Sequence, residues 1–278
     1  MKTTYLTLLF SIILPFVHAS SHKYKGGDEY TRRRLDSDEI EMSSGLLRSS
    51  ILRTVKIVNT VTRSVGTGFY LYETPDSYVF LTNYHVLGSS DECRGAKLLM
   101  LDSNFDKKRL RCNKVLEIGD YSTGSDHMIF SMSKGKRTEF LAELDQITHF
   151  ENDAQVGDEL SIVGFGGAKT NDRRFDIGVS EDQDCILLDV GKDVSFNNLL
   201  MPSILFTACD IRSGDSGSAV FNKRTGSLVG LLFATSKHKD GVTRAEIKDN
   251  LGRYYERFHT HSSYAIDIES INLEKYRY

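Results

Sequence analysis

The chain has 278 residues, and its 35 Lys and Arg against 38 Asp and Glu give a formal net charge of −3 at pH 7. This balance argues against a nucleic-acid or anionic-membrane partner, since both favour a strong basic excess. Local basic runs at 31–34 and 107–109 lack interleaved aromatic residues. We therefore interpret them as processing or solvated sites.

The first nineteen residues predict a cleaved secretory signal peptide (1–19). One lysine precedes an apolar run from Tyr5 to Val17, and small residues stand near Ala19, where a signal peptidase cuts. A membrane anchor is the alternative, but the run is shorter than the ~20 residues that a bilayer span needs. We therefore expect a secreted chain, extracellular or periplasmic, without membrane contact after the signal is removed.

Residues 20–50 are polar, charged and interspersed with Gly and Ser, which predicts a flexible leader or propeptide. The run Arg32 to Arg34 and Arg48 are candidate cleavage sites for a processing protease. A plain disordered tail is equally compatible with this composition.

From about Ile51 the pattern changes to short runs rich in β-branched and aromatic residues. Eleven such runs lie at 54–61, 66–73, 78–87, 96–103, 128–132, 158–166, 185–190, 203–210, 217–222, 228–234 and 263–268. They indicate an all-β sandwich or barrel. Residues 243–258 have helical spacing, weakened by Gly252, and residues 268–278 predict a short closing helix.

The four cysteines favour disulfides in an exported chain. Three connectivities are open, and proximity in the sequence favours Cys93 with Cys112 and Cys185 with Cys209. A zinc site is the competing interpretation, but no Cys-x-x-Cys spacing occurs. We therefore expect no bound metal.

The stretch GDSGSAV, residues 214–220, places Ser216 between an aspartate and a glycine. Flexible neighbours suit a nucleophile that needs close backbone approach and free N–H groups, although the same residues also form tight turns. A serine nucleophile needs a base and an acid that orients the base. His85 follows the apolar run 78–84, and Asp126 precedes the run 128–132, with Asp120 as the second candidate acid.

The order His85, Asp126 and Ser216, within LTNYHVL, SDHMIF and GDSGSAV, resembles the chymotrypsin-like (trypsin-like) serine peptidases, in particular their glutamyl endopeptidase and HtrA-type branch. The segments GTGF at 66–69 and YAIDI at 264–268 resemble two further strands of that branch. The resemblance covers 51–278. It implies an all-β fold of two six-stranded antiparallel β-barrels with the active site between them, and no metal or organic cofactor.

The resemblance also implies roles for individual residues. Ser216 would attack a peptide carbonyl, His85 would take and return the proton, and Asp126 would orient His85. The N–H groups of Gly214 and Ser216 would form an oxyanion hole, while Gly217 would leave room for the acyl group.

Substrate preference depends, in the trypsin-like pattern, on the residue six positions before the nucleophile, here Asp210. A carboxylate there would favour Arg or Lys before the cut, but Asp210 could instead pair with Arg212, and the segment also resembles the HtrA type, in which this position does not select charge. The wall of the pocket should come from Phe233, Ala234 and Thr235. The insert 237–262 is expected to shape substrate access.

Trypsin-type zymogens free an Ile-Val-Gly-Gly terminus that pairs with the aspartate before the nucleophile. This chain has Asp215 but no such tetrapeptide, so the sequence does not predict activation by that route. A catalytically inactive, peptidase-like secreted binding protein is the alternative function. An α/β-hydrolase esterase is disfavoured, because GDSGS lacks the spacing of its Gly-x-Ser-x-Gly elbow.

Overall fold

The computed structural model describes residues 32–147, 150, 153–168, 175–181, 185–196, 199–235 and 263–277. The expected signal peptide, the insert 237–262 and the expected helix at 243–258 lie outside these residues. Within them, no helix combines the length and the apolar character that crossing a membrane requires.

The first half of the chain forms a seven-stranded sheet with every pairing antiparallel. Its order is β6-β5-β2-β3-β4-β8-β7, and the strands are β2 (Thr54–Asn59), β3 (Ser64–Glu73), β4 (Ser77–Thr82), β5 (Lys97–Leu101), β6 (Lys107–Leu110), β7 (Lys114–Ile118) and β8 (Met128–Ser133). The short helix α3 (Ser90–Gly95) connects β4 to β5, and the 3-10 helices η1 (Tyr121–Thr123) and η2 (Glu139–Glu143) flank β8 in the chain.

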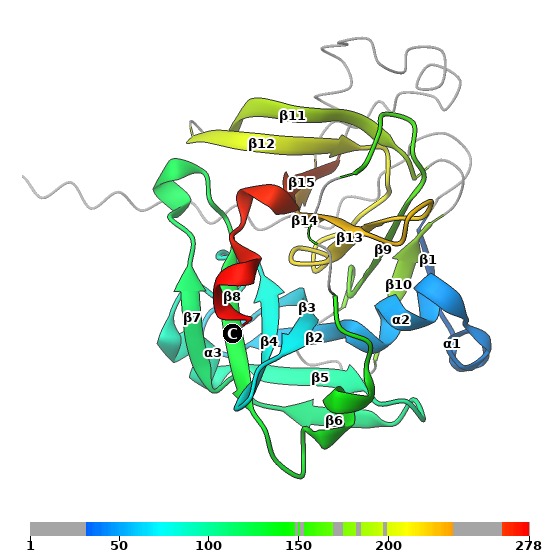
Figure 1. Ribbon diagram of the computed structural model, residues 1–278, viewed down its shortest axis with the longest axis vertical. Coiled ribbons are helices and arrows are strands. Elements are labelled where there is room, and N and C mark those ends of the chain that lie inside the picture. The colour runs from blue at the N-terminus through cyan, green and yellow to red at the C-terminus, as the bar shows by residue number, and fades with distance from the viewer. Residues whose placement is uncertain are drawn as a thin grey trace, which may run out of the picture.

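The second sheet is also antiparallel and has eight strands. Its order is β1-β10-β9-β13-β14-β15-β12-β11, and the strands are β1 (Arg32–Arg34), β9 (Leu160–Gly164), β10 (Gly178–Ser180), β11 (Leu187–Phe196), β12 (Leu199–Thr207), β13 (Ala219–Asn222), β14 (Leu228–Thr235) and β15 (Ser263–Asp267). Figure 1 shows the two sheets as the lower and upper halves of the molecule. The predicted chymotrypsin-like all-β architecture is confirmed, with more strands in each sheet than the six expected.

Side chains of the central strands β3 and β4 point alternately to the two faces of their sheet, and this alternation links the cores of the two halves of the molecule. Phe69 and Leu71 of β3, with Leu81 of β4, pack in a buried cluster that includes Ile204 of β12 and Ile266 of β15. The intervening side chains face the other way, into a cluster with β2, β5 and β8. Successive side chains of a strand point to opposite faces, so one pair of strands contributes to both cores.

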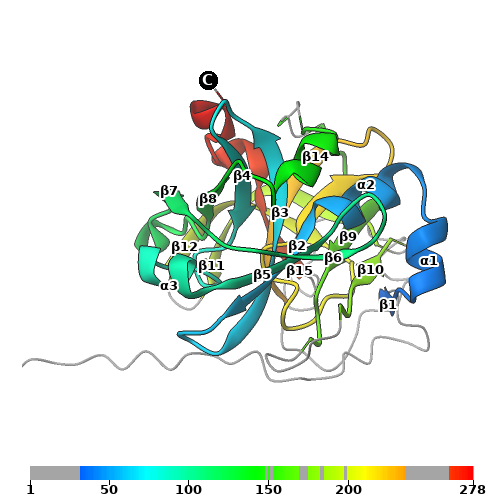
Figure 2. The ribbon, with the colours of Figure 1, turned by 90° about the horizontal axis from the view of Figure 1, so that it is seen from below.

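The segment 32–50 is structured, in contrast to the flexible leader expected from its composition. Strand β1 pairs with β10, and the helices α1 (Ser37–Met42) and α2 (Gly45–Arg53) follow. Asp36 and Glu39 form a capping box at the start of α1, and Leu35 and Ile40 are buried. Figure 2 shows β1 beside β10 with α1 next to it. This segment needs few apolar side chains of its own because it pairs with β10 of the eight-stranded sheet.

Both favoured disulfides are present in the structure, Cys93 with Cys112 and Cys185 with Cys209. The first ties α3 to the segment between β6 and β7. The second ends one residue before Asp210. The expected closing helix is a pair of 3-10 helices, η3 (Ile268–Ser270) and η4 (Leu273–Tyr276).

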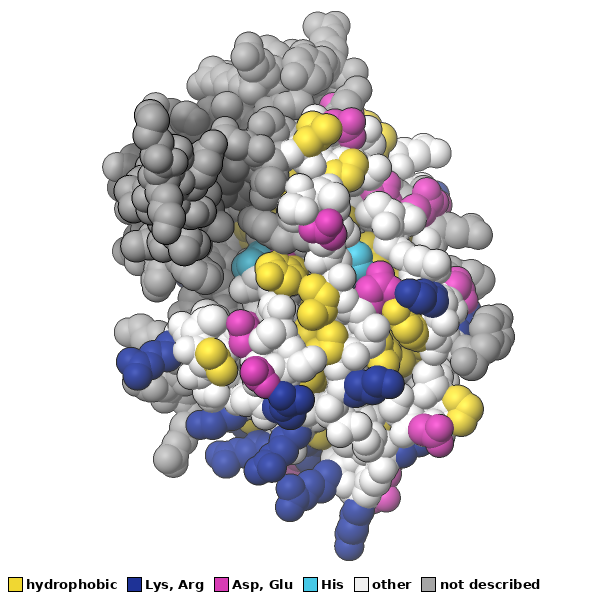
Figure 3. All heavy atoms as spheres, turned by 90° about the vertical axis from the view of Figure 1, so that its left-hand side faces the viewer, with side chains coloured by type: hydrophobic (Ala, Val, Ile, Leu, Met, Phe, Trp, Pro, Cys, Tyr) yellow, Lys and Arg dark blue, Asp and Glu magenta, His cyan; other side chains and the backbone are white. Residues whose placement is uncertain are grey.

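The basic run of β6 lies at the edge of the seven-stranded sheet. Lys107 and Arg109 are exposed, while the Lys108 ammonium lies 2.6 Å from the Asp102 carboxylate. Figure 3 shows Lys and Arg side chains gathered on the lower part of the molecule, where this sheet lies. Charged edge strands discourage pairing with other chains.

Candidate active site

His85 and Asp126 meet because the strands that carry them are neighbours. Thr82, the last residue of β4, pairs with Met128, the first residue of β8. His85 follows the end of β4 and Asp126 precedes the start of β8, so both residues lie at the same end of this pair of strands. The Asp126 carboxylate lies 2.7 Å from His85 Nδ1 and accepts the His85 backbone N–H at 3.0 Å.

The two residues differ in their exposure to water. The His85 side chain is 39% exposed, whereas that of Asp126 is 1% exposed. Burial lowers the pKa of His85. The charge of Asp126 and its hydrogen bond together raise that pKa by more than burial lowers it, so the net shift is upward. This arrangement stabilises a protonated imidazole, as a general base requires after it accepts a proton.

Asp120, the second candidate acid, lies in a different environment. It is exposed, and its carboxylate accepts hydrogen bonds from the backbone N–H and the hydroxyl of Ser122. These bonds lower the pKa of Asp120. The structure thus brings Asp126, and not Asp120, to His85.

Ser216 lies in the loop between β12 and β13, and this loop docks on the other sheet. Thr67 of β3 donates its backbone N–H to the Ser216 carbonyl at 2.8 Å and its hydroxyl to the Gly214 carbonyl at 2.7 Å. Among the described residues, the Ser216 hydroxyl donates to the Phe233 carbonyl at 3.4 Å and forms no hydrogen bond with His85. Thr67 thereby fixes the loop against the sheet that carries His85 and Asp126.

The backbone N–H groups of Gly214 and Ser216 donate no hydrogen bond among the described residues, whereas those of Asp215, Gly217 and Ser218 all do. In a trans peptide, N–H and C=O point in opposite directions. The Ser213 carbonyl, which shares its peptide with the Gly214 N–H, accepts from Gly167 at 2.8 Å. The Asp215 carbonyl, which shares its peptide with the Ser216 N–H, accepts from Ser218 at 2.9 Å. Both unused N–H groups therefore have fixed directions.

The structure shows a packing requirement for glycine at position 217. A Cβ at this position would lie 1.9 Å from the Thr67 carbonyl oxygen and 2.5 Å from Thr82 Oγ1. Its φ of +88° is also rare for residues with a side chain. The glycine lets the loop approach β3 closely.

The residues expected at the specificity pocket are half-buried or buried. Asp210 is half-buried, and its charge opposes the burial that lowers the pKa of Arg32. The Phe233 ring is buried and lies 6.1 Å from the ring of Tyr264, measured between centroids. Ala234 and Thr235, at the end of β14, are half-buried.

Three residues of this region were missed in the sequence. Thr67 lies inside the GTGF segment, which the family resemblance already marked. Asn83 donates its side-chain amide to the Asp126 carbonyl at 2.8 Å, and it stands two residues before His85. Arg32 contacts Asp215 from the leader, and nothing in the run of arginines indicates this role. The described residues contain no cluster of His, Cys, Asp or Glu that could hold a metal ion.

Comparisons with known proteins identify a family for this chain and a solved structure of similar fold. A family described as trypsin-like peptidase domain matches residues 66–231, more than half of the chain. The crystal structure of Deg5 is similar in fold, with a TM-score of 0.54 and 17% identity over 85% of this chain and 92% of that chain. The Rv3671c protease from M. tuberculosis in its active form has a TM-score of 0.49 and 15% identity, covering 84% of this chain and 82% of that chain. The comparison with curated proteins finds no match.

Proposed function

The chain belongs to the trypsin-like peptidase family, and we propose that it is a secreted serine endopeptidase with Ser216 as nucleophile, His85 as general base and Asp126 as the acid that orients the base. The resemblance seen in the sequence motifs is confirmed by the family match. Its substrates are proteins or peptides. Export is supported by the apolar N-terminal run and by the two disulfides, which persist in oxidising compartments.

The observation that carries the proposal is the convergence of three elements on one site. His85 and Asp126 form a pair with a 2.7 Å contact, and the Ser216 loop docks on the same sheet through Thr67 with two free N–H groups in fixed directions. A base with its acid, a serine and two unused donors are the parts that acyl transfer requires.

The reaction begins when the Ser216 side chain turns from the Phe233 carbonyl toward His85. Asp126 accepts a hydrogen bond from Nδ1–H and so holds that proton on Nδ1. Nε2 is therefore unprotonated and can accept the proton of the serine hydroxyl. The serine oxygen attacks the peptide carbonyl, and the resulting oxyanion accepts from Gly214 N–H and Ser216 N–H. His85 then protonates the leaving amine, and water releases the acyl group from Ser216 by the same steps.

Ser216→Ala tests the proposed function. The signal-free chain with intact Ser216 and the Ser216→Ala variant are exposed to a fluorophosphonate probe and to a mixed peptide library. We expect labelling and cleavage with the intact chain alone, and Ser218→Ala, next to the site, serves as a matched control that still reacts. Failure of the folded intact chain to label or cleave would support the peptidase-like binding protein instead.

The activity should rise with pH through a pKa above 6.5, the ordinary value for histidine, because His85 must be neutral to act as a base and Asp126 raises its pKa. The same shift affects stability in the opposite sense: its contribution is full below pH 6.5 and is lost as pH rises through the pKa of folded His85. The measurement is kcat/KM against pH, with thermal unfolding over the same range.

His127→Gln is the control for this profile. His127 is buried, its Nε2 lies 3.2 Å from the Glu117 carboxylate, and it is the only histidine besides His85 among the described residues. The rising limb should keep its midpoint in this variant. A limb at or below 6.5 in the unmodified chain, or one that moves with His127→Gln, would contradict the assignment to His85.

Asp210 supplies the charge for a preference for Arg or Lys before the cut. We expect Asp210→Ala to lower kcat/KM for substrates with Arg more than for substrates with Leu, because a fixed carboxylate pairs with the cation alone. The readout is the ratio of the two values in each protein. If Asp210 acts only on Arg32, both values fall together and the ratio stays constant, which would end the specificity proposal.

A further inference from the structure

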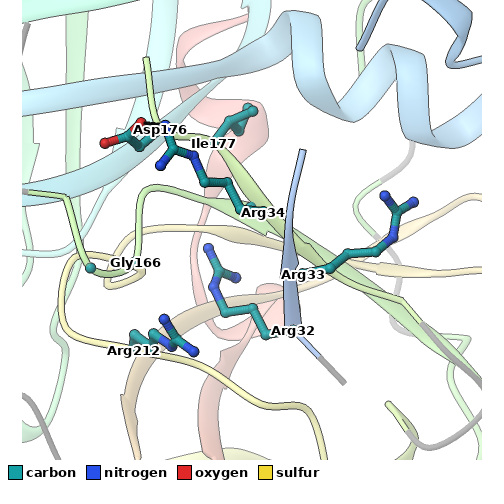
Figure 4. Close-up of a pocket in the computed structure, with 9 residues that line it drawn as sticks. Arg32, Arg33, Arg34, Gly166, Asp176, Ile177 and Arg212 are labelled. Atoms are coloured by element: carbon teal, nitrogen blue, oxygen red, sulfur yellow. Dashed lines mark hydrogen bonds and ion pairs between the residues drawn. The ribbon is translucent and has the colours of Figure 1, made fainter. Parts of the chain in front are cut away.

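Arg32 forms a buried ion pair with Asp215, the residue directly before Ser216. Its Nη2 lies 2.8 Å from Asp215 Oδ1, and the two side chains are 5% and 0% exposed. The same nitrogen donates to the Gly164 carbonyl at 3.1 Å. Figure 4 shows Arg32 and Arg34 on one side of β1 and Arg33 on the other. Arg33 and Arg34 make exposed ion pairs with Glu39, Glu181 and Asp176.

Three glycines leave the space that this ion pair occupies. A Cβ at Gly164 would lie 2.5 Å from Asp215 Oδ1, one at Gly166 would lie 2.2 Å from Asp215 Oδ2, and one at Gly178 would lie 2.7 Å from Arg32 Nη2. These glycines lie on β9, the turn after it and β10. The backbone of the second sheet therefore leaves room for the Arg32–Asp215 ion pair, because these three positions carry no side chain.

The Asp215 carboxylate connects Arg32 to the oxyanion donors. It accepts the backbone N–H of Arg212 and that of Gly166, both at 2.8 Å. The next residue, Gly167, donates to the Ser213 carbonyl and so directs the Gly214 N–H. Burial raises the pKa of Asp215, and Arg32 acts against this shift. The guanidinium thus favours the ionised carboxylate that accepts these bonds.

We propose that Arg32 is a positioning residue for the peptidase, whose guanidinium holds Asp215 and thereby the loop that carries the Gly214 and Ser216 N–H groups. The inference rests on the proposed function. It gives an internal side chain the role that a freed amino terminus has in trypsin-type zymogens. The inference also reverses the expectation that the leader is cut at Arg32 to Arg34. A cut after any of these three residues would separate Arg32 from the rest of the peptidase domain and lower activity.

The test compares Arg32→Met, which keeps the volume, with Arg32→Lys, which keeps the charge, in the signal-free chain. Loss of one oxyanion donor typically lowers kcat by about 10²-fold or more. We expect Arg32→Met to lose about 100-fold in kcat with little change in KM, and Arg32→Lys to recover most of it. Arg34→Met, on the same face of β1 but exposed, is the control and should retain activity.

Chemical rescue adds a readout that a merely structural role would not produce. Arg32, Arg34 and Arg212 line a cavity of about 300 Å³. Guanidinium, at concentrations far below those that unfold proteins, should restore kcat to Arg32→Met through this cavity, whereas sodium at equal ionic strength should not. If Arg32→Met does not fold, Arg32→Lys and an Arg32→Gln variant carry the same comparison, with Lys the more active.

Two measurements separate failure of this inference from failure of the proposed function. If the unmodified chain does not label at Ser216, the proposed function fails, and hydrogen exchange at the Gly166 amide still reports on the ion pair: faster exchange in Arg32→Met supports the contact, and equal exchange overturns it. If the unmodified chain labels and the uncharged variant reacts with the same kcat, Arg32 is not a positioning residue.

Discussion

Asp126→Asn should lower kcat by about 10⁴-fold, the size of loss that this substitution causes in serine peptidase triads. The reason lies in the two bonds of the carboxylate. One oxygen accepts the His85 backbone N–H and the other faces Nδ1. An amide has one oxygen, and if it keeps the backbone bond its NH₂ faces Nδ1. The proton then moves to Nε2, which can no longer accept the proton of Ser216.

The flipped amide does not restore activity, because its NH₂ would then face the His85 backbone N–H, and two donors would meet in a buried site. The measurement is single-turnover acylation, and Asp120→Asn is the matched control because Asp120 is exposed and bonded to Ser122. We expect the control to react at the unmodified rate. Equal losses in the two variants, or a larger loss at Asp120, would show that the wrong aspartate has been assigned.

The fold was largely predictable because its central strands carry the alternation that burial demands. Each of the eleven predicted runs overlaps a strand of the structure. The strands that were missed are β1, β6, β7 and β10, and the first three lie at sheet edges. Their sequences RRR, KKRL, KVLEI and GVS are charged or very short. Edge strands bury little apolar surface and tolerate charge, so hydrophobic periodicity does not reveal them.

The site was predictable to a different degree. His85, Asp126 and the Ser216 loop each stand near the end of an apolar run, where strands of a barrel place functional residues, and their spacing in the chain indicated a family. The contact of Arg32 with Asp215 joins residues that lie far apart in the chain. No local pattern distinguishes Arg32 from Arg33, because which arginine is buried depends on the register of β1 on β10, with Arg32 opposite Ser180. That register is a tertiary property.

Gly217→Ala should have the other large effect, on both stability and activity. A Cβ 1.9 Å from the Thr67 oxygen has to move by roughly 1.5 Å to reach ordinary contact at 3.4 Å, and a misplacement of about 1 Å already costs about 10²-fold in rate. Overpacking of a dense interior adds about 1–3 kcal/mol to a left-handed φ that itself costs roughly 1–2 kcal/mol. We therefore expect a loss of at least about 100-fold in kcat/KM and about 2–5 kcal/mol in the free energy of unfolding.

Gly226→Ala separates the two causes. Gly226 has a φ of +77°, close to that of Gly217, but a Cβ there would meet nothing within 4 Å. It should lose only the roughly 1–2 kcal/mol of the left-handed conformation and keep its activity. Thermal unfolding and kcat/KM of both variants decide the matter: equal destabilisation would mean that conformation alone requires glycine at 217. A larger loss in Gly217→Ala, accompanied by loss of acylation, would mean that the docking of the Ser216 loop on Thr67 is what the glycine protects.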